Sequence, residues 1–302
     1  MDLKYRNQVA LLLRILSVIA REKDFALHGG TAINLFYHNM PRLSVDIDLT
    51  YIPFGNRITD LALIRSKLLS IKERLMKYIP NIRVKAPVKV GDDMKLYCSI
   101  PEAAVKVEVN TINRGITGIP VLRSLCHGAQ ELFDSFCEIQ VVPEAQLFGG
   151  KIVAALDRQH PRDLFDLKKM FESIGYTENI HQGFLFCLLS SKRPVHEILK
   201  PSPINQKSVL ENHFTGMTDE EFTYEMFEST RSLLIKSIYS KLTLKDKKLL
   251  MSFAGGNPEW PDTDYSVYPG VQWKLLNINK LKKADNKKFS MQLTQLEDVL
   301  SK

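Results

Sequence analysis

The sequence predicts an α+β protein whose strands are gathered in the N-terminal half and whose C-terminal half is mainly helical. Residues 25–28, 44–49 and 82–112 hold short apolar or alternating stretches, many with β-branched residues, which is typical of strands. From residue 144 onward the apolar residues recur at steps of three and four, which is typical of amphipathic helices. A segregation of this kind favours the α+β class.

The length of the chain and its loop signals predict two domains. One domain usually takes about 100 to 200 residues, and this chain has 302. Gly115 and Gly118 mark loops, and Pro143 ends a short predicted strand. We therefore predict one domain over 1–143 and a mainly helical one over 144–302.

The charge balance favours a polyanionic partner. Lys and Arg number 41 against 34 Asp and Glu, which gives a net charge of +7. An excess spread along the chain is a weak sign of nucleic-acid binding, since many basic proteins simply have solvated lysines.

Membrane and secretory classes are not indicated. No long uncharged apolar run is present, and Arg14 interrupts the apolar N-terminal stretch, which reads as an amphipathic core helix rather than a signal peptide. The four cysteines form no CxxC pair, which argues against a zinc ribbon and a disulfide framework. We expect a cytoplasmic protein without a membrane partner.

A glycine pair precedes a predicted helix near the N-terminus. Gly29 and Gly30 follow the apolar stretch 25–28, and TAINLFYH then has a helical apolar pattern over 31–38. Glycines let a backbone approach a ligand closely, and a helix N-terminus attracts anions. The stretch predicts a site for a phosphate group.

Two acids follow in the segment SVDIDL, residues 44–49. The alternation of this segment puts Asp46 and Asp48 on one face of a strand, with Cα atoms roughly 7 Å apart. Two carboxylates at this spacing can hold one hard cation.

Glu108 is a candidate third carboxylate. In the stretch AVKVEVN, Val105, Val107 and Val109 take one strand face and Glu108 takes the other. If this strand lies beside that of Asp46, Glu108 joins the acid pair at a metal site. Otherwise Glu108 is an ordinary solvent-facing glutamate, and the sequence leaves both interpretations open.

A second group of charged residues begins the helical half. Lys151 lies in a predicted helix over 144–157, and Arg158 follows it by seven residues, on the same face if the helix continues. Pro161 suits the first turn of a new helix, with Arg162 just inside it. Three cations directed one way would suit a triphosphate.

The new helix also carries two acids in its first turns, Asp163 and Asp166. Acids at this end of a helix interact favourably with the helix dipole, so a capping role is the simplest interpretation.

The segments GGTAINL, SVDIDL and KIVAALDRQHPRDLFDL, in this order, resemble the AbiEii family of nucleotidyltransferase toxins, which occur in toxin–antitoxin and phage-abortive-infection systems within the polymerase-β-like superfamily. The resemblance implies an N-terminal polymerase-β-like nucleotidyltransferase domain with a small mixed sheet. It also implies that the helical domain completes the nucleotide pocket and binds the acceptor.

The resemblance assigns roles to the residues of the first domain. It implies that Gly29, Gly30 and Thr31 hold the nucleotide phosphates, where Thr31 keeps the hydroxyl of the serine common in the superfamily. It implies that Asp46 and Asp48 bind the metal.

The resemblance also assigns roles to the later residues. It implies that Lys151 binds phosphate and that Asp166 is the fourth-motif acid. Asp163 is the competing candidate, and we prefer a structural or salt-bridging role for it. Glu108 matches the third strand carboxylate of the superfamily, which implies a role as a metal ligand.

The implied activity is transfer of a nucleoside monophosphate from an NTP to RNA, with release of pyrophosphate. The cofactor would be Mg²⁺, or Mn²⁺ in its place, because phosphoryl chemistry of this kind needs a hard cation. Lys151 with Arg158 or Arg162 would stabilise the leaving pyrophosphate, and Glu108 or Asp166 would help to activate the acceptor hydroxyl.

The family resemblance implies that the acceptor is the 3′ end of tRNA, so that translation is blocked, and that a cognate antitoxin is encoded nearby. Two alternatives stay open. The enzyme could modify a protein hydroxyl or a small molecule, or the chain could be a nucleotide-binding module without activity.

Overall fold

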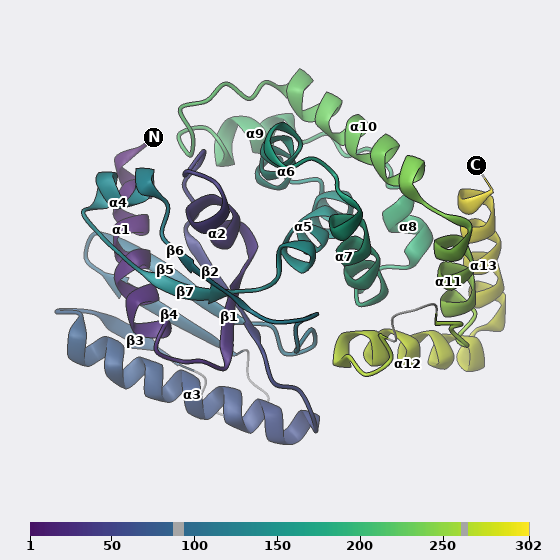
Figure 1. The fold of residues 1–302 in the computed structure, drawn as a ribbon, viewed down its shortest axis with the longest axis horizontal. Helices are drawn as coiled ribbons and strands as arrows, with labels where there is room; N and C mark the ends of the chain where they lie inside the picture. The colour runs from purple at the N-terminus through teal and green to yellow at the C-terminus, as the bar shows by residue number, and fades with distance from the viewer. Residues whose placement is uncertain (87–93, 261–264, 302) are drawn as a thin grey trace. The chain divides into compact units, whose positions relative to one another are not determined.

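The computed structural model describes residues 1–86, 94–260 and 265–301. It forms two compact units (Figure 1). Unit 1 comprises Met1–Pro143 and Phe214–Glu221, and unit 2 comprises Glu144–His213 and Phe222–Lys302. The chain thus passes into unit 2 directly after Pro143 and returns once to unit 1, a return that the sequence did not indicate.

Unit 1 is built on a mixed seven-stranded sheet with the order β3-β4-β5-β2-β1-β7-β6. The strands are β1 (Phe25–His28), β2 (Asp46–Tyr51), β3 (Arg83–Lys85), β4 (Lys95–Ile100), β5 (Ala103–Val109), β6 (Val121–Ser124) and β7 (Glu138–Val141). β2 is antiparallel to β1 and parallel to β5, while β1 is parallel to β7. The strand with the two acids therefore lies between the strand that leads into the glycines and the strand of Glu108.

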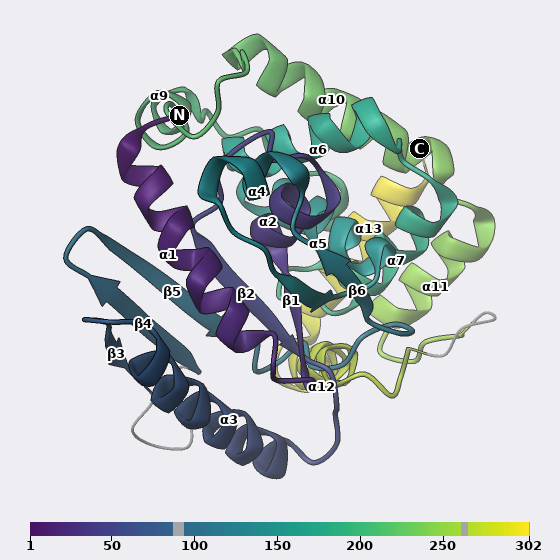
Figure 2. The ribbon, with the colours of Figure 1, turned by 60° about the vertical axis from the view of Figure 1, so that its left-hand side comes forward.

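Helices cover the apolar side of this sheet. The helical segments of unit 1 are α1 (Leu3–Ile19), α2 (Gly29–Ala32), the π-helix η1 (Ile33–Tyr37), α3 (Arg57–Tyr78) and α4 (His127–Phe133). α3 buries Ile64, Leu68, Ile71 and Leu75, whose spacing forms one helix face. α1 runs along the sheet and contacts β5 and α3 (Figure 2). This leaves the polar faces of β3, β4 and β5 on the other side.

Several boundaries differ from those predicted. The helix predicted over 31–38 starts at Gly29, and its second half is η1. β6 and α4 fall in a region without a clear pattern, because β6 is largely exposed and α4 buries only Ala129. The sequence also predicts a turn at Gly91-Asp92-Asp93, and these residues lie outside the described ones.

Unit 2 is helical in its described residues. Its helices are α5 (Glu144–Arg158), α6 (Pro161–Ser173), α7 (Glu178–Leu189), α8 (Val195–Leu199), α9 (Lys207–His213), α10 (Tyr224–Lys241), α11 (Leu244–Ala254), α12 (Pro269–Ala284) and α13 (Asn286–Leu300). None of the helices described in the chain has the length and apolar character needed to cross a bilayer.

α5 and α7 pack backbone to backbone at two glycines. A Cβ atom on Gly149 would lie 2.3 Å from the carbonyl carbon of Gly183, and one on Gly183 would lie 1.9 Å from the carbonyl oxygen of Ala145. Gly149 therefore does not break the helix. The contact fixes the segment of α5 that carries Lys151, two residues further on.

Candidate active site

The glycine turn is packed directly against one of the predicted metal acids. Gly29 begins α2 immediately after β1 and has a φ of +72°, a conformation that favours glycine. A Cβ atom at this position would lie 2.4 Å from Asp48 Oδ2. Residue 29 must therefore be glycine for the turn and the carboxylate to lie this close.

The second glycine lies against a buried arginine. A Cβ atom on Gly30 would be 2.7 Å from a guanidinium nitrogen of Arg42 and 3.1 Å from the hydroxyl of Ser44. Arg42 is only 2% exposed and donates a hydrogen bond to the carbonyl oxygen of Leu43. Sequence reasoning missed Arg42, although it continues the two-residue spacing of Ser44 and Asp46.

Thr31 ties the glycine turn to the start of β2. Its hydroxyl donates to the backbone carbonyl of Asp46 and lies 3.0 Å from the hydroxyl of Ser44. The side chain is 1% exposed, so the hydroxyl is enclosed by these partners. The side-chain amide of Asn34 adds a bond to the carbonyl of Gly30 at 2.9 Å. The loop is therefore held rigidly beside the acids.

His28 ends β1 opposite Asp48. Its Nδ1 lies 3.2 Å from the hydroxyl of Thr50 on the neighbouring strand. This contact links the side chains of the two neighbouring strands β1 and β2.

The three predicted acids lie on two adjacent strands. Asp46 and Asp48 are half-buried on β2, and the parallel strand β5 sets Glu108 opposite Asp48. The adjacency on which the third-carboxylate interpretation depended is therefore present. Directly opposite neighbours on adjacent strands lie about 5 Å apart.

Lysines hold Glu108 in the structure. Its carboxylate lies 2.9 Å from Lys106 Nζ and 3.5 Å from Lys95 Nζ. The hydrogen bond to Glu108, together with the charges of Asp46 and Asp48, raises the pKa of the Lys106 ammonium despite partial burial. Lys106 is a second residue that sequence reasoning did not single out, although it shares the strand face of Glu108.

The acid pair on β2 has the chemistry that a magnesium site requires. Mg²⁺ takes oxygen ligands and is usually held by one or two carboxylates, together with substrate phosphates and water. Asp46 and Asp48 meet this description. Among the described residues, no group of three or more His, Cys, Asp or Glu side chains is gathered closely enough to hold a metal ion.

In unit 2, Lys151 is buried between two carboxylates. Its Nζ lies 2.8 Å from Asp163 Oδ1 and 2.9 Å from Asp166 Oδ2, and both acids are essentially unexposed. The lysine comes from α5 and both acids from α6, so the three side chains link the two helices. The break at His160 between them is a helix cap, since the His160 ring accepts a bond from the backbone N–H of Arg162.

Asp163 also binds Arg158. The guanidinium contacts both carboxylate oxygens, at 2.9 Å for Asp163 Oδ1, while the arginine stays 61% exposed. Burial alone would raise the pKa of Asp163, but Lys151 and Arg158 outweigh burial and hold that pKa well below its usual range. Lys151 and Arg158 thus share one face of a continuous α5, and both contact Asp163.

A model of the family described as nucleotidyl transferase AbiEii toxin, of the type IV toxin–antitoxin system, matches residues 10–277. This match covers most of the chain. The chain belongs to the AbiEii family. It is therefore a nucleotidyltransferase toxin of a type IV toxin–antitoxin system, and the family and activity predicted from the motifs are confirmed.

Among solved structures, the AbiEii-family chain is similar to MenT4, a nucleotidyltransferase toxin from Mycobacterium tuberculosis H37Rv. The TM-score is 0.63 and the identity 13%, and the match covers 91% of this chain and 93% of that one. A likeness at this identity establishes a shared fold, and the predicted α+β class with a mixed sheet is confirmed. No curated protein sequence matches the chain.

Proposed function

We propose that this AbiEii-family enzyme transfers a nucleoside monophosphate from an NTP to RNA, at the 3′ end of tRNA, in a Mg²⁺-dependent reaction in the cytoplasm. The observation that carries the proposal is the packing of the Gly29 turn on Asp48, with Asp46 on the same strand. This arrangement provides a phosphate-sized turn and two metal-binding carboxylates side by side.

In unit 1, the proposed role of Gly29, Gly30 and Thr31 is to present backbone N–H groups to the phosphates. Asp46 and Asp48 would hold Mg²⁺, or Mn²⁺ in its place. The bound cation would neutralise charge on the triphosphate and lower the pKa of the attacking hydroxyl. Glu108 is the proposed third carboxylate. In this role it would exchange its lysine partners for the cation or the acceptor hydroxyl.

In unit 2, the proposed phosphate-binding residue is Lys151. Asp163 acts as a positioning residue, since it binds the amine of Lys151 and the guanidinium of Arg158. Asp166 is the proposed fourth-motif acid. Arg158 and Arg162 are the proposed contacts to the leaving pyrophosphate.

The reaction forms one bond and breaks one. The oxygen of the acceptor hydroxyl attacks the α-phosphorus, and the bond from that phosphorus to the oxygen that bridges to the β-phosphate breaks. Pyrophosphate carries away the electron pair of the broken bond. The hydroxyl proton passes to a carboxylate, for which Glu108 or Asp166 is the candidate.

A labelling experiment tests this proposal. The protein is incubated with Mg²⁺, total RNA, cell protein and each of the four α-labelled NTPs in turn, and RNA and protein are then separated. Label at the 3′ ends of tRNA supports the proposal. Label in protein or in a small molecule would assign a different acceptor, and tight NTP binding without pyrophosphate release would indicate a non-catalytic module.

The toxin–antitoxin assignment predicts a cognate antitoxin encoded by a neighbouring gene. Co-expression of that gene should relieve growth inhibition by this protein. Persistent inhibition with every neighbouring gene would argue against such a partner.

A further inference from the structure

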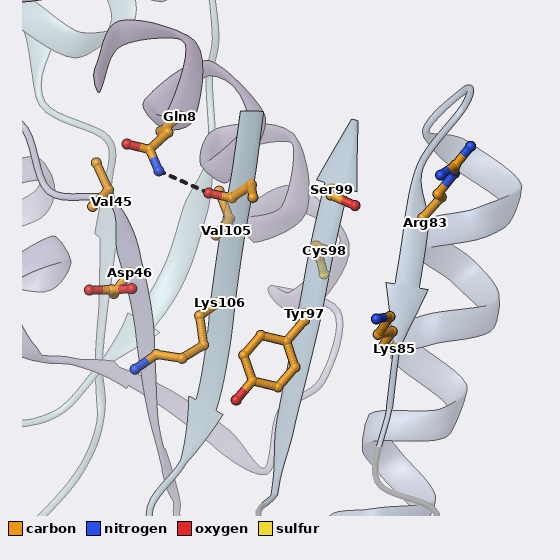
Figure 3. Close-up of a pocket in the computed structure, with 11 residues that line it drawn as sticks. Gln8, Val45, Asp46, Arg83, Lys85, Tyr97, Cys98, Ser99, Val105 and Lys106 are labelled. Atoms are coloured by element: carbon orange, nitrogen blue, oxygen red, sulfur yellow. Dashed lines mark hydrogen bonds between the residues drawn. The ribbon is translucent and has the colours of Figure 1, made fainter. Parts of the chain in front are cut away.

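A hollow of about 700 Å³ opens on the polar side of unit 1, next to Asp46 (Figure 3). It lies over β3, β4, β5 and the start of β2, and all of its lining residues belong to unit 1. The apolar faces of these strands are turned to the core, where Val84, Leu96 and Val107 are buried. The lining includes polar side chains that alternate with this core set, together with Gln8 of α1 and the buried residues Cys98 and Val105.

Strand register sets four of these side chains in one row across the sheet. Lys85 lies opposite Tyr97, Tyr97 opposite Lys106, and Lys106 opposite Asp46. Neighbouring strands lie about 4.8 Å apart, so the row extends roughly 14 Å from the acid. Figure 3 shows the four side chains on four successive strands, with Arg83 one row further along β3.

The residues of the row have the chemistry of a single-strand binding surface. Tyr97 is 53% exposed, although it is a large aromatic side chain. Arg83 and Lys85 are exposed, and in the part of the chain that the structure describes neither forms an ion pair. An exposed ring beside cations binds single-stranded nucleic acid, because bases stack on the ring and phosphates contact the cations.

The hollow lies on the side of β2 opposite to the glycine turn. The glycine turn follows β1 on one side of β2, and β5, β4 and β3 lie on the other. In phosphoryl transfer the attacking and leaving oxygens are roughly in line with the phosphorus. If the turn holds the phosphates of the NTP, the acceptor hydroxyl approaches from the side of β5.

We propose that this hollow binds the single-stranded 3′ end of the acceptor RNA, with Tyr97 stacked on a base and Arg83 and Lys85 on the phosphates. The inference rests on the proposed function, because it assigns the RNA acceptor to a surface. It adds an aromatic residue that binds the acceptor, Tyr97, two strands away from the strand of Asp46 and Asp48.

Binding of a short RNA tests the inference without catalysis. A fluorescent single-stranded oligonucleotide with the sequence of a tRNA 3′ end is titrated with the full chain, without NTP, and anisotropy is recorded. Tyr97→Ala should weaken binding about tenfold, since stacking on one aromatic side chain contributes about 1–3 kcal/mol. Tyr97→Phe keeps the ring and should bind like the wild type, while the double variant Arg83→Ala/Lys85→Ala should bind more weakly, most clearly at low salt.

Matched controls come from other surfaces of unit 1. Phe136, at 63% exposure, is an aromatic residue near β7 that is somewhat more exposed than Tyr97, and Lys77 is an exposed lysine on α3. Phe136→Ala and Lys77→Ala should leave RNA binding unchanged. In the transfer assay, Tyr97→Ala should raise KM for RNA about tenfold and leave KM for the NTP unchanged.

The two proposals fail in distinguishable ways. If the wild type labels tRNA while Tyr97→Ala and the double variant behave like the controls, the hollow is not the acceptor site and the proposed function stands. If the wild type labels protein instead of RNA, the proposed function is wrong. In that case, if the oligonucleotide does not bind to the wild type, the proposal that the hollow binds RNA is wrong as well. If it binds to the wild type and to Tyr97→Phe but only weakly to Tyr97→Ala, the hollow is supported as an RNA-binding surface.

Discussion

Gly29 makes the most demanding single-residue contact of the proposed nucleotide site. Gly29→Ala would add a methyl group 2.4 Å from Asp48 Oδ2 in a backbone conformation that alanine rarely adopts. We expect at least a hundredfold loss of nucleotidyl transfer, because the turn or Asp48 must move, and a loss of about 1–3 kcal/mol of unfolding free energy. Steady-state kinetics and urea denaturation measure the two effects.

Gly118 provides the control for Gly29→Ala. It also has a positive φ, of +103°, but nothing lies within 4 Å of the position of its Cβ atom. Gly118→Ala should destabilise the fold and keep the activity per folded molecule. Equal loss of activity in both variants would mean that backbone strain, and not the contact with Asp48, explains the effect of Gly29→Ala.

Asp163 makes the stability of the protein depend on acid pH. Its folded pKa lies well below the ordinary 3.8, so its carboxylate stabilises the fold fully above pH 3.8, and this contribution is lost as the pH falls below that value. Asp163→Asn should lose about 3–5 kcal/mol of unfolding free energy at pH 7, because it breaks a buried ion pair. When the pH is lowered from 5 to about 3, the unfolding free energy of Asp163→Asn should decrease by less than that of the wild type.

Urea denaturation across this pH range measures the difference, with Asp157→Asn as the control. Asp157 is an exposed acid on α5 that pairs with Arg193, so its removal should change stability by less than about 1 kcal/mol. Parallel pH profiles for Asp163→Asn and the wild type would contradict the assignment of Asp163 as an ionised partner of Lys151.

The sequence was sufficient to predict which acids share a strand face, but not which residues from other parts of the chain contact the site. Alternation in SVDIDL set Asp46 and Asp48 side by side, and the structure has both on β2. Arg42 and Lys106 were missed because each looks like an ordinary surface cation in sequence. Their proximity to Gly30 and to Glu108 arises from chain folding and strand pairing, which local patterns do not encode.

At the level of helices, the α5–α7 contact positions the Lys151 group. Gly183→Ala would set a methyl group 1.9 Å from the carbonyl oxygen of Ala145, which belongs to the backbone and cannot rotate away. The helices must separate, and we expect a loss of about 1–3 kcal/mol of unfolding free energy with reduced transfer activity. Thermal denaturation checks this, and Gln182→Ala, at an exposed position of α7, should be close to neutral. An unchanged melting temperature for Gly183→Ala would show that the close packing is not required.

Strong periodicity decided which elements could be predicted. The strand β1 was predicted with its observed ends, because an apolar run marks it. The sequence also predicts a helix over 58–78, within one residue of the observed ends of α3, because apolar residues recur at steps of three and four. β6 and α4 bury almost no side chains, so they leave no pattern to detect. A glycine such as Gly149 inside a helical pattern usually weakens the helix, and the close packing against α7 explains its presence here.

The length of the chain and its loop signals did not predict the return of Phe214–Glu221 to unit 1. Its contacts are long-range in sequence: the N–H of Leu43 donates to the carbonyl of Met217 at 2.7 Å, and the hydroxyl of Thr218 donates to the carbonyl of Pro41 at 2.7 Å. These bonds fix the segment that precedes the two acids. They accept on backbone carbonyl groups, which every residue carries, so the sequence gives little sign of them.

For the whole molecule, the net charge of +7 predicts RNA binding that weakens with salt. The logarithm of affinity for the oligonucleotide should fall linearly with the logarithm of salt concentration. Arg83→Ala/Lys85→Ala should reduce the slope by about 1.4, since each phosphate contact on a single strand contributes about 0.7. Lys77→Ala should leave the slope unchanged, and the same slope for all three proteins would exclude phosphate contacts by Arg83 and Lys85.

The most direct test of the central claim is transfer of an α-labelled nucleotide to purified tRNA by the wild type and by Asp48→Asn. The variant keeps the shape of the side chain packed on Gly29 and removes its charge. We predict label at the tRNA 3′ end with the wild type and none above background with the variant, at equal folded protein. Labelling of tRNA by Asp48→Asn at the wild-type rate, or no labelling of tRNA by the wild type with any NTP, would contradict the account.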